Sequence, residues 1–347
     1  MFGKLMNSYY YGKSGKGDYR KEDLPRTRWQ LFWEMLRVRF AGLIRLNLLY
    51  MVIWLPAMIV LMMGVMGVIY GVIPDEPMVD DPTAVVEEGE MPSAEEATAI
   101  VGEEAEAVEV VERSPEEIVG MVQSVLMMTL LLLIPCIAIT GPFTAGLSYV
   151  TRNWARDEHA FPWSDFIDAV KANWKPSLVV SFITSLMPLI MYMCWTYYGD
   201  LAEANAIMVI PQAITVMLGI LWSLAVTYAY PMIVSYNMRL KDVLRNSLLL
   251  AIGRLPMSLG IRLLHCVPAV IGFLVAMFIS TTWGLFGLMA YYMLLGFGLS
   301  RFITASYTNA AFDRFINSRI EGAVVNRGLN TDPIDDEDDG DEEAEEE

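Results

Sequence analysis

The sequence predicts an all-α, polytopic membrane helix bundle with about six transmembrane helices and additional amphipathic helices at the cytoplasmic interface. Apolar residues make up 55% of the 347 positions, which exceeds their usual share in soluble domains. Residues 206–238 contain no Asp, Glu, Lys or Arg, and ~20 such residues are enough to cross a bilayer as a helix. Lys and Arg also fall in alternate connections between the apolar runs. These observations exclude a multi-domain soluble protein.

The apolar runs define the expected spans. Each run is long enough to cross a hydrocarbon layer of ~30 Å, and internal Pro and Gly residues are tolerated because neighbouring helices satisfy the freed backbone groups. In the first run, Gly67 and Gly71 have the Gly-x-x-x-Gly spacing that can let two membrane helices approach closely. The spans are expected near residues 46–73, 118–140, 177–198, 206–234, 259–282 and 284–305.

The distribution of Lys and Arg predicts the topology. With six spans, 23 of the 24 basic residues fall on one side of the membrane, and only Arg113 falls in a connection on the other side. Positively charged connections tend to stay in the cytoplasm. The sequence therefore predicts a multi-pass protein of the cell membrane with both termini in the cytoplasm.

The net charge of −17 comes from two acidic segments. Residues 74–117 contain 16 acids and residues 331–347 contain 12, and both segments are expected to be disordered. The rest of the chain carries 13 acids and 23 basic residues, so its cytoplasmic face is expected to be basic. The expected partner of this face is the anionic cytoplasmic leaflet, where each basic residue gains ~1 kcal/mol, and not a nucleic acid.

These features divide the chain into four regions. The first is a basic N-terminal segment with an amphipathic helix at residues 29–40, and the second holds two spans and the acidic loop. The third is the core, with a cytoplasmic helical hairpin and four spans, and the last is an acidic cytoplasmic tail. The expected regions are 1–45, 46–140, 141–320 and 321–347.

The hairpin is expected directly after the second span, in the segment TGPFTAGLSYVTRNWAR at residues 140–156. Gly141 is expected to end the span and Pro142 to begin a separate helix, because these residues favour those positions. The new helix has an apolar face and a polar one, which is typical of a helix lying in the membrane interface. The apolar face holds Phe143, Leu147, Val150 and Trp154, while Thr144, Thr151, Arg152 and Arg156 lie off it.

Two further amphipathic helices are expected on the same side of the membrane. The second helix of the hairpin covers residues 164–175, with Ser164 as its N-cap, and the next span restarts at Lys175-Pro176. The other amphipathic segment covers residues 239–256.

The sequence carries no recognisable catalytic pattern, such as H-E-x-x-H or G-x-S-x-G. The three cysteines lie within spans, where apolar packing explains them, and His159 lies in a connection, where it is expected to be solvated. The sequence therefore predicts a protein that is not an enzyme and has no cofactor and no metal site.

Three polar residues in the last two spans form a candidate intramembrane site. They are Arg262, His265 and Arg301, and the two arginines are expected at similar depths near the cytoplasmic boundary. One interpretation is that the side chains reach back to the interface, with His265 as an interfacial residue. The alternative is a shared site for an anionic ligand, because polar groups at membrane depth are functional candidates.

Several ordered motifs resemble those of the YesL family of bacterial membrane proteins. The resemblance extends over most of residues 1–330 and rests on FGKLMNSYY, RLNLLYMVIWLP, GPFTAGLSYVTRNWARDE, FPWSDFIDAVKANWK and KDVLRNSLLLAIGRLP. That family has no established activity, and its members tend to be linked with carbohydrate-uptake systems in Gram-positive bacteria. The motif positions to which the resemblance gives structural roles are Gly141, Pro142, Gly146, Tyr149, Arg152, Asp165, Phe166 and Asn173.

Two functional hypotheses follow. The first is a non-enzymatic membrane accessory or scaffold protein for a carbohydrate-uptake system, docking sugar-transporter subunits through its cytoplasmic hairpin. The alternative is a transporter or an ABC-type permease subunit for a small solute. The segment at residues 241–256 loosely resembles the coupling helix of such permeases, but it lacks their E-A-A start and central Asp-Gly.

Overall fold

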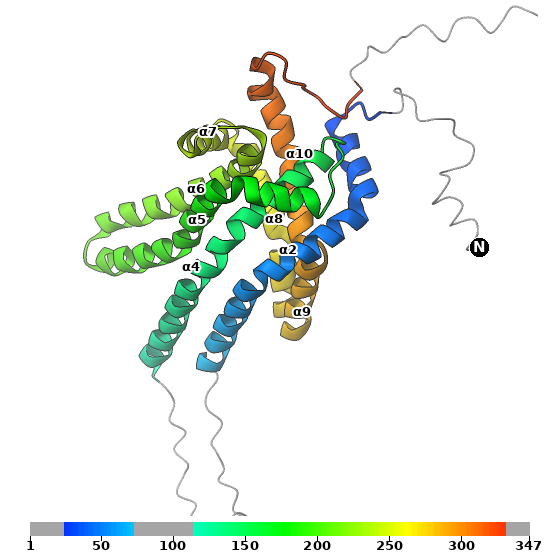
Figure 1. Cartoon of the computed structure of the whole chain (residues 1–347). Helices are drawn as coiled ribbons and strands as arrows, with labels where there is room; N and C mark the ends of the chain where they lie inside the picture. The colour runs from blue at the N-terminus through cyan, green and yellow to red at the C-terminus, as the bar shows by residue number, and fades with distance from the viewer. Residues whose placement is uncertain (1–23, 73–113, 331–347) are drawn as a thin grey trace, which may run out of the picture. The chain divides into compact units, whose positions relative to one another are not determined.

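The computed structural model describes residues 24–72 and 114–330, which form α-helices and no strand (Figure 1). Within these ranges, six helices are long and apolar enough to cross a membrane. The expected all-α polytopic membrane helix bundle is therefore confirmed. Most of the predicted acidic loop and the acidic end of the tail lie outside the described residues.

From α4 onward the helices follow one another with short connections. The first two spans are α2 and α4, the next two are α5 and α6, and α7 is a shorter helix before the fifth span, α8. The sixth span is divided by a π-helical turn into α9, η3 and α10. The bounds are α2 Arg28–Val72, α4 Pro115–Trp154, α5 Ser164–Ala204, η2 Ala206–Met208, α6 Val209–Ser235, α7 Leu240–Gly253, α8 Leu255–Phe278, α9 Thr281–Tyr291, η3 Tyr292–Gly296, α10 Phe297–Phe315 and η4 Asn317–Arg319.

The chain forms two compact units, which we call unit 1 (Met1–Leu55 and Pro135–Glu347) and unit 2 (Pro56–Ile134). In unit 2 the end of α2 packs against the start of α4 through small residues. A Cβ atom on Gly64 would lie 2.5 Å from Thr129 Oγ1, and one on Gly67 would lie 2.9 Å from Val125 Cγ1. The predicted close approach is confirmed at Gly67, and Gly64 extends it by about one turn. At Gly71 a Cβ atom would lie 3.9 Å from Met121 Cε, which is an ordinary contact, so this half of the prediction is wrong.

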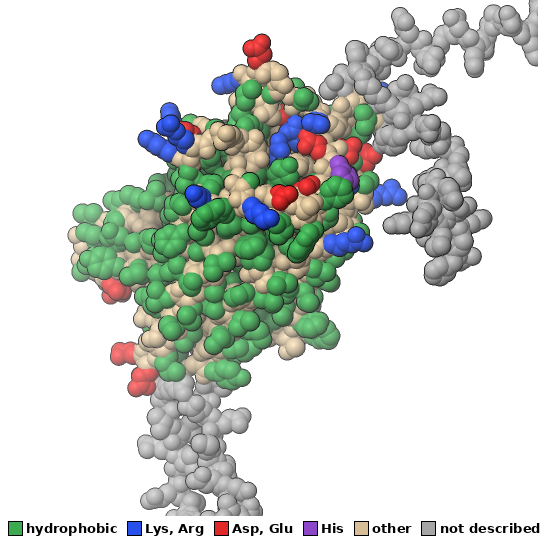
Figure 2. Space-filling view, viewed as in Figure 1, with side chains coloured by type: hydrophobic (Ala, Val, Ile, Leu, Met, Phe, Trp, Pro, Cys, Tyr) green, Lys and Arg blue, Asp and Glu red, His purple; other side chains and the backbone are tan. Residues whose placement is uncertain are grey.

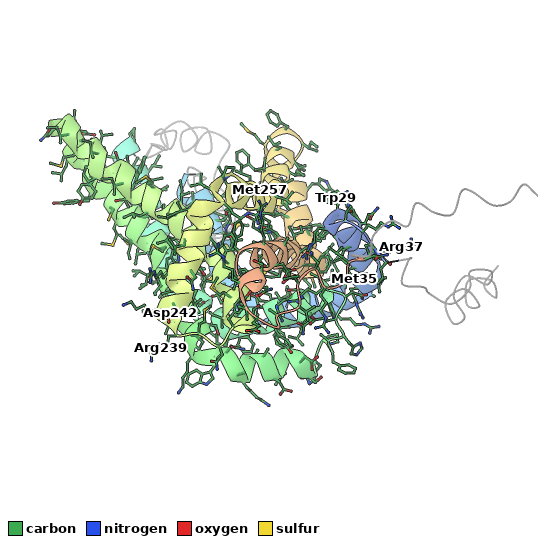
Figure 3. All side chains as sticks on the ribbon, turned by 90° about the horizontal axis from the view of Figure 1, so that it is seen from above. Trp29, Met35, Arg37, Arg239, Asp242 and Met257 are labelled. Atoms are coloured by element: carbon green, nitrogen blue, oxygen red, sulfur yellow. The ribbon has the colours of Figure 1, made fainter. Side chains whose placement is uncertain are left out.

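The helices of unit 1 share one end that carries most of the Lys and Arg residues that the structure describes, and we call it the basic end. α2, α5 and α8 begin there, α4, α6 and α10 end there, and α7 lies there as well (Figure 1). Lys and Arg side chains gather at this end, and hydrophobic side chains cover the helices next to it (Figure 2). Viewed from this end, Trp29 and Arg37 of α2 lie on a different side from Arg239 and Asp242 near the start of α7 (Figure 3).

The predicted turn at Gly141 is wrong, because α4 continues through Gly141-Pro142 to Trp154. Pro142 removes one backbone donor from the helix. The helical turn before Pro142 is stabilised from α5, because the Ser181 hydroxyl donates to the Ile137 carbonyl at 2.6 Å. Gly141 has a packing role instead, because a Cβ atom there would overlap with the Ser177 carbonyl and lie 2.5 Å from Ser181 Cβ.

The two predicted interfacial helices of the hairpin are also wrong as separate elements. They are the end of α4 and the beginning of α5, and the predicted restart at Lys175-Pro176 is absent because Pro176 lies inside α5. The cap position of α5 is Trp163 and not Ser164, and its first turn is stabilised by Asp165, whose carboxylate accepts from the Phe161 N–H at 2.8 Å.

The end of α4 is buried on both of its predicted faces, so it does not lie in the membrane interface. Leu147 and Val150 are 0% exposed, and the supposedly polar face is buried too, with Thr144 at 2% and Thr151 at 0%. Thr144 and Thr151 can be buried because each hydroxyl donates to the backbone carbonyl four residues earlier in its own helix.

Two other amphipathic segments were expected as separate helices. The one at residues 29–40 is the start of α2, so it is continuous with the first span. The one at residues 239–256 is largely confirmed as α7, which ends at Gly253, and α8 follows after a single non-helical residue, Arg254.

The core of unit 1 consists of two clusters of buried side chains. One joins α6 and α7 with α10 around Tyr228, Met232 and Phe312. The other joins the first part of α2 to the end of α4 and the first half of α10 around Tyr50, Trp154 and Phe302. Elsewhere the spans expose large apolar residues, as expected for helices surrounded by lipid.

A buried asparagine holds the π-helical turn of the sixth span. Asn47 of α2 is 0% exposed, and its amide group donates to the carbonyls of Tyr292 and Met293 at 3.0 and 2.8 Å. Its oxygen accepts from the Gly298 N–H at 2.8 Å. A π turn disrupts the regular backbone ladder, so this one side chain supplies partners that the helix itself does not provide.

Replacing Asn47 with leucine is expected to destabilise the protein by about 2 to 3 kcal/mol, because two carbonyls and one N–H lose their buried partner. The matched substitution Asn205→Leu removes one hydrogen bond, which Asn205 Oδ1 accepts from the N–H of Ile207 two residues later. It is expected to cost about 1 kcal/mol. Melting temperatures of the two variants in detergent test the difference. Equal losses would show that the π turn does not depend on Asn47.

Candidate functional site

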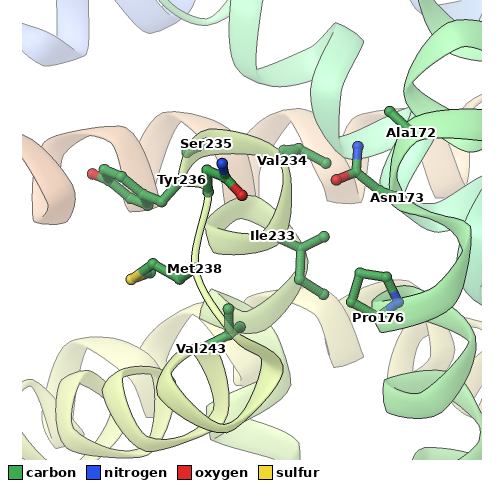
Figure 4. A pocket seen from close by; sticks show the side chains of 10 residues that line it. Ala172, Asn173, Pro176, Ile233, Val234, Ser235, Tyr236, Met238 and Val243 are labelled. Atoms are coloured by element: carbon green, nitrogen blue, oxygen red, sulfur yellow. The ribbon is translucent and has the colours of Figure 1, made fainter.

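A hollow of about 370 Å³ opens at the basic end between α5, the end of α6 and the start of α7 (Figure 4). α6 ends at Ser235, and Tyr236 continues the chain in an extended conformation toward α7. The backbone of this connection therefore forms one wall. The hollow is lined by Ala172, Asn173, Pro176, Ile233, Val234, Ser235, Tyr236, Asn237, Met238 and Val243.

The opposite wall of the hollow comes from the first part of α5. The amide group of Asn173 donates to the Ala169 carbonyl at 3.0 Å, which holds its side chain in place. In Figure 4 this side chain points from α5 toward the end of α6. Pro176 lies on the same side of the hollow, and the Ser177 hydroxyl donates to the Asn173 carbonyl beside it.

The lining of the hollow is polar but uncharged. Of its ten residues, only Tyr236 is titratable. Burial raises the pKa of the Tyr236 phenol to about 12, against the opposing effect of Arg152, so the phenol stays protonated at neutral pH. Tyr236 also donates to Asn317 Oδ1 at 2.7 Å. A neutral, hydrogen-bonding surface of this kind is suited to binding and lacks the acid–base pair that proton transfer needs.

A network of charged and amide side chains supports Tyr236. Asp313 of α10 is 5% exposed and forms an ion pair with Arg28 at the start of α2. The same carboxylate accepts from Asn317 Nδ2 at 2.7 Å and from the Asn326 N–H at 3.1 Å. The network thus connects the first helix, the last helix and the segment after it.

The segment after α10 returns across the basic end. Arg156 donates to the Val324 carbonyl at 3.2 Å, and its side chain forms an ion pair with Glu158. Glu158 also pairs with Arg327 at 3.2 Å. Residues 317–330 therefore pack against the turn between α4 and α5, where His159 is exposed, as the sequence predicts.

The eight motif positions follow the contact between α4 and α5. Gly141 and Gly146 are points of close approach, since a Cβ atom on Gly146 would lie 2.8 Å from the Phe166 carbonyl oxygen. Phe166 is 1% exposed and belongs to a core cluster against which Tyr149 also packs. Asp165 stabilises the first turn of α5, and Pro142 lies inside α4. Most of these positions therefore hold two helices together and do not surround a ligand.

Two motif positions lie nearer to the hollow. Asn173 is part of its lining. Arg152 is half-buried close enough to Tyr236 to affect its ionisation, and its guanidinium donates to Asn153 Oδ1 at 3.2 Å. Asn309 of α10 donates to the Arg152 carbonyl at 3.2 Å, which joins α10 to the end of α4.

The structure brings together the three predicted intramembrane residues, Arg262, His265 and Arg301. Arg262 donates to the Ser223 carbonyl of α6, and the guanidinium of Arg301 lies 5.3 Å from the centre of the Tyr230 ring. His265 lies beside the backbone of Ser300. The two arginines are close enough to repel each other, and both act on His265.

Asn47, Tyr236, Asp313 and Asn317 are not among the sequence-predicted site residues. A signal exists for Asp313, because it is the only Asp or Glu between residues 243 and 320. A lone acid at the end of an apolar run needs a cationic partner. No comparable signal exists for Tyr236, whose role depends on a connection between helices.

Comparisons with known proteins find similarity without a known activity. A family described as a protein of unknown function, DUF624, matches residues 121–195. The chain is also 26% identical over 127 residues to the uncharacterized protein YesV of Bacillus subtilis (strain 168). That stretch covers 36% of this chain and 60% of YesV. No solved structure matches. The similarity to YesV and DUF624 supports a relationship to uncharacterized proteins, and the resemblance to the YesL family itself stays a prediction.

Proposed function

We propose that this protein is a non-enzymatic membrane accessory protein that docks onto a subunit of a carbohydrate-uptake system through the hollow at its basic end. The hollow carries the proposal because its surface is polar and uncharged, with Asn173, Ser235, Tyr236 and Asn237 among its lining residues. Such a surface can hydrogen-bond a short peptide segment of a partner protein without the cost of desolvating a charge.

The location of the lining residues in the sequence also supports a docking function for the hollow. One wall comes from Ala172, Asn173 and Pro176, which lie within the part of the chain that matches DUF624. The clustering of Lys and Arg at the basic end favours a cytoplasmic position for it. The link to carbohydrate uptake rests on the resemblance to the YesL family.

Filling the hollow is expected to abolish docking. In the substitution Ala172→Trp, an indole ring would occupy the space beside Asn173. A photo-crosslinking amino acid at Asn237, an exposed residue of the lining, reports on the occupant in intact cells. The wild-type background is expected to give one adduct with a solute-transporter subunit, identified by mass spectrometry. The same experiment in the Ala172→Trp background is expected to lose that adduct at least tenfold.

The matched control is Ala204→Trp, which places the same ring at the exposed far end of α5. It is expected to leave the adduct unchanged. An adduct that persists in Ala172→Trp, or that contains only lipid, would contradict docking through the hollow. Solute flux through proteoliposomes that contain this protein alone would contradict an accessory role and support the permease alternative.

A further inference from the structure

The cluster of Arg262, His265 and Arg301 has no counter-charge. Among the described residues neither arginine pairs with a carboxylate, and the sequence contains no Asp or Glu between residues 243 and 312. Two cations that repel each other inside a membrane-spanning bundle are unfavourable, because the low dielectric strengthens the repulsion and desolvation removes the compensating water. An anion bound between the two guanidinium groups would offset this electrostatic repulsion.

The cluster also has free hydrogen-bonding groups. Arg262 Nε and His265 Nε2 are buried and have no partner among the described residues. The guanidinium of Arg301 is oriented by the face of Tyr230 and makes no ion pair there. A planar guanidinium matches the oxygens of a phosphate group in a two-pronged arrangement, which favours a phosphate-type oxyanion over a single-atom anion.

The cluster lies closer to the basic end of the bundle than to the opposite end of α8. α8 begins at Leu255, so Arg262 lies about 10 Å and His265 about 15 Å along the helix from the basic end. Long arginine side chains reach back toward the nearer interface. Arg262 and His265 therefore lie in the half of α8 nearer to the basic end, where the headgroups of that leaflet supply the nearest lipid phosphates.

The surface beside the cluster is apolar, which indicates the source of the oxyanion. Leu259 and Leu263, on the turns of α8 around Arg262, are 39% and 59% exposed. The next residue after His265, Cys266, is exposed as well. Spans in a bilayer present such residues to acyl chains, so a ligand that enters from this side must itself be a lipid.

The π-helical turn lies next to the same cluster. Tyr292, its first residue, lies near Cys266 of α8, and the turn precedes Arg301 in the same span. π turns inside helices are frequent at functional sites. Asn47 holds the turn from α2, so the position of Arg301 depends on a dedicated hydrogen-bonded support.

We infer from this geometry that Arg262, His265 and Arg301 bind the phosphate group of an anionic phospholipid from the leaflet at the basic end. The two guanidinium groups hold the phosphate oxygens, His265 closes the site on its inner side, and the acyl chains lie along α8. The site is separate from the hollow at the end of α6, so it binds lipid whether or not a partner protein is docked.

The test uses the full chain, purified in detergent and stripped of lipid. Native mass spectrometry and melting temperatures are recorded with phosphatidylglycerol, with phosphatidylcholine and with inorganic phosphate. The wild-type protein is expected to retain and be stabilised by phosphatidylglycerol, and far less by the other two. The single variants Arg262→Gln and Arg301→Gln are each expected to bind phosphatidylglycerol about five- to tenfold more weakly. The double variant is expected to weaken binding by the product of the two single effects.

The charge-matched control is Lys241→Gln with Arg245→Gln, two exposed residues of α7 at the same end. It is expected to bind phosphatidylglycerol as the wild type does. Equal weakening in the control and in the arginine double variant would overturn the site, because general surface charge would then explain binding. Inorganic phosphate that stabilises as strongly as phosphatidylglycerol at equal concentration would overturn the lipid as the occupant.

Folding is tested by the same variants without added lipid. Replacing the two unneutralised cations with glutamine removes their mutual repulsion, so the lipid-free double variant is expected to melt no lower than the wild type. A markedly lower lipid-free melting temperature would show that the arginines serve folding and would overturn the proposal.

Discussion

Replacing Gly141 with leucine is expected to force α4 and α5 apart and to destabilise the protein by about 3 kcal/mol or more. A Cβ atom at this position would overlap with the Ser177 carbonyl, which belongs to a helix backbone and cannot rotate away. Overpacking against flexible side chains costs about 1 to 3 kcal/mol, and a rigid neighbour raises that cost. The melting temperature in detergent and the yield of monodisperse protein measure the effect.

The matched control is Gly260→Leu in α8, where a Cβ atom would meet no other atom within 4 Å. Leucine is a better helix former than glycine by about 1 kcal/mol, so this variant is expected to be as stable as the wild type or more stable. If Gly141→Leu melted like Gly260→Leu, the close contact between α4 and α5 at Gly141 would not exist.

The fold class could be predicted because it follows from composition alone. Hydrocarbon selects long helices without charges, and this requirement leaves apolar runs that can be recognised in the sequence without any knowledge of packing. The expected spans correspond to the six long apolar helices of the described chain. The extents of these helices could not be predicted, since α2, α4 and α5 continue well beyond the apolar runs.

Gly141-Pro142 shows why the helix ends were predicted wrongly. In an isolated chain the pair favours the end of one helix and the beginning of another. In the folded protein the helix continues because α5 packs directly onto the glycine, and because Ser181 donates to the Ile137 carbonyl in the turn before the proline. Both causes come from a helix that lies about 40 residues later, so no local pattern contains them.

The two parts of the candidate site differ in how much the sequence reveals. Arg262 and His265 are three residues apart, which places them on one helix face, and Arg301 is at a matching depth in the next span. Charge in an apolar run is a strong signal, so the cluster could be predicted. The hollow is lined by ordinary residues of three helices and the connection between α6 and α7, and its shape arises only when α5, α6 and α7 are packed together.

The basic end is held together by a few long-range polar contacts in addition to its apolar core. Arg28 and Asp313 are 285 positions apart, and Tyr236 and Asn317 are 81 apart. Through Asn317, the carboxylate of Asp313 supports the phenol that lines the hollow. The shape of the hollow therefore depends on a charge that lies outside it.

Replacing Asp313 with asparagine is accordingly expected to destabilise the protein by about 2 to 3 kcal/mol. The variant loses the ion pair with Arg28 and one of the acceptors for Asn317 and Asn326. Removing one partner of a buried ion pair costs about 3 to 5 kcal/mol, and the 28% exposure of the Arg28 side chain reduces that cost. Melting in detergent measures the loss. Trypsin cleavage after Arg319 and Arg327 is expected to accelerate, because the segment after α10 loses its anchor.

The matched control is Asp242→Asn, which removes the same charge from an exposed position in the first turn of α7. Its effect is expected to stay within about 0.5 kcal/mol, since only an interaction with the helix dipole is lost. Because both variants change the net charge equally, any difference between them comes from the contacts of Asp313. Identical melting and identical cleavage rates in the two variants would mean that apolar packing alone holds the last segment against the bundle.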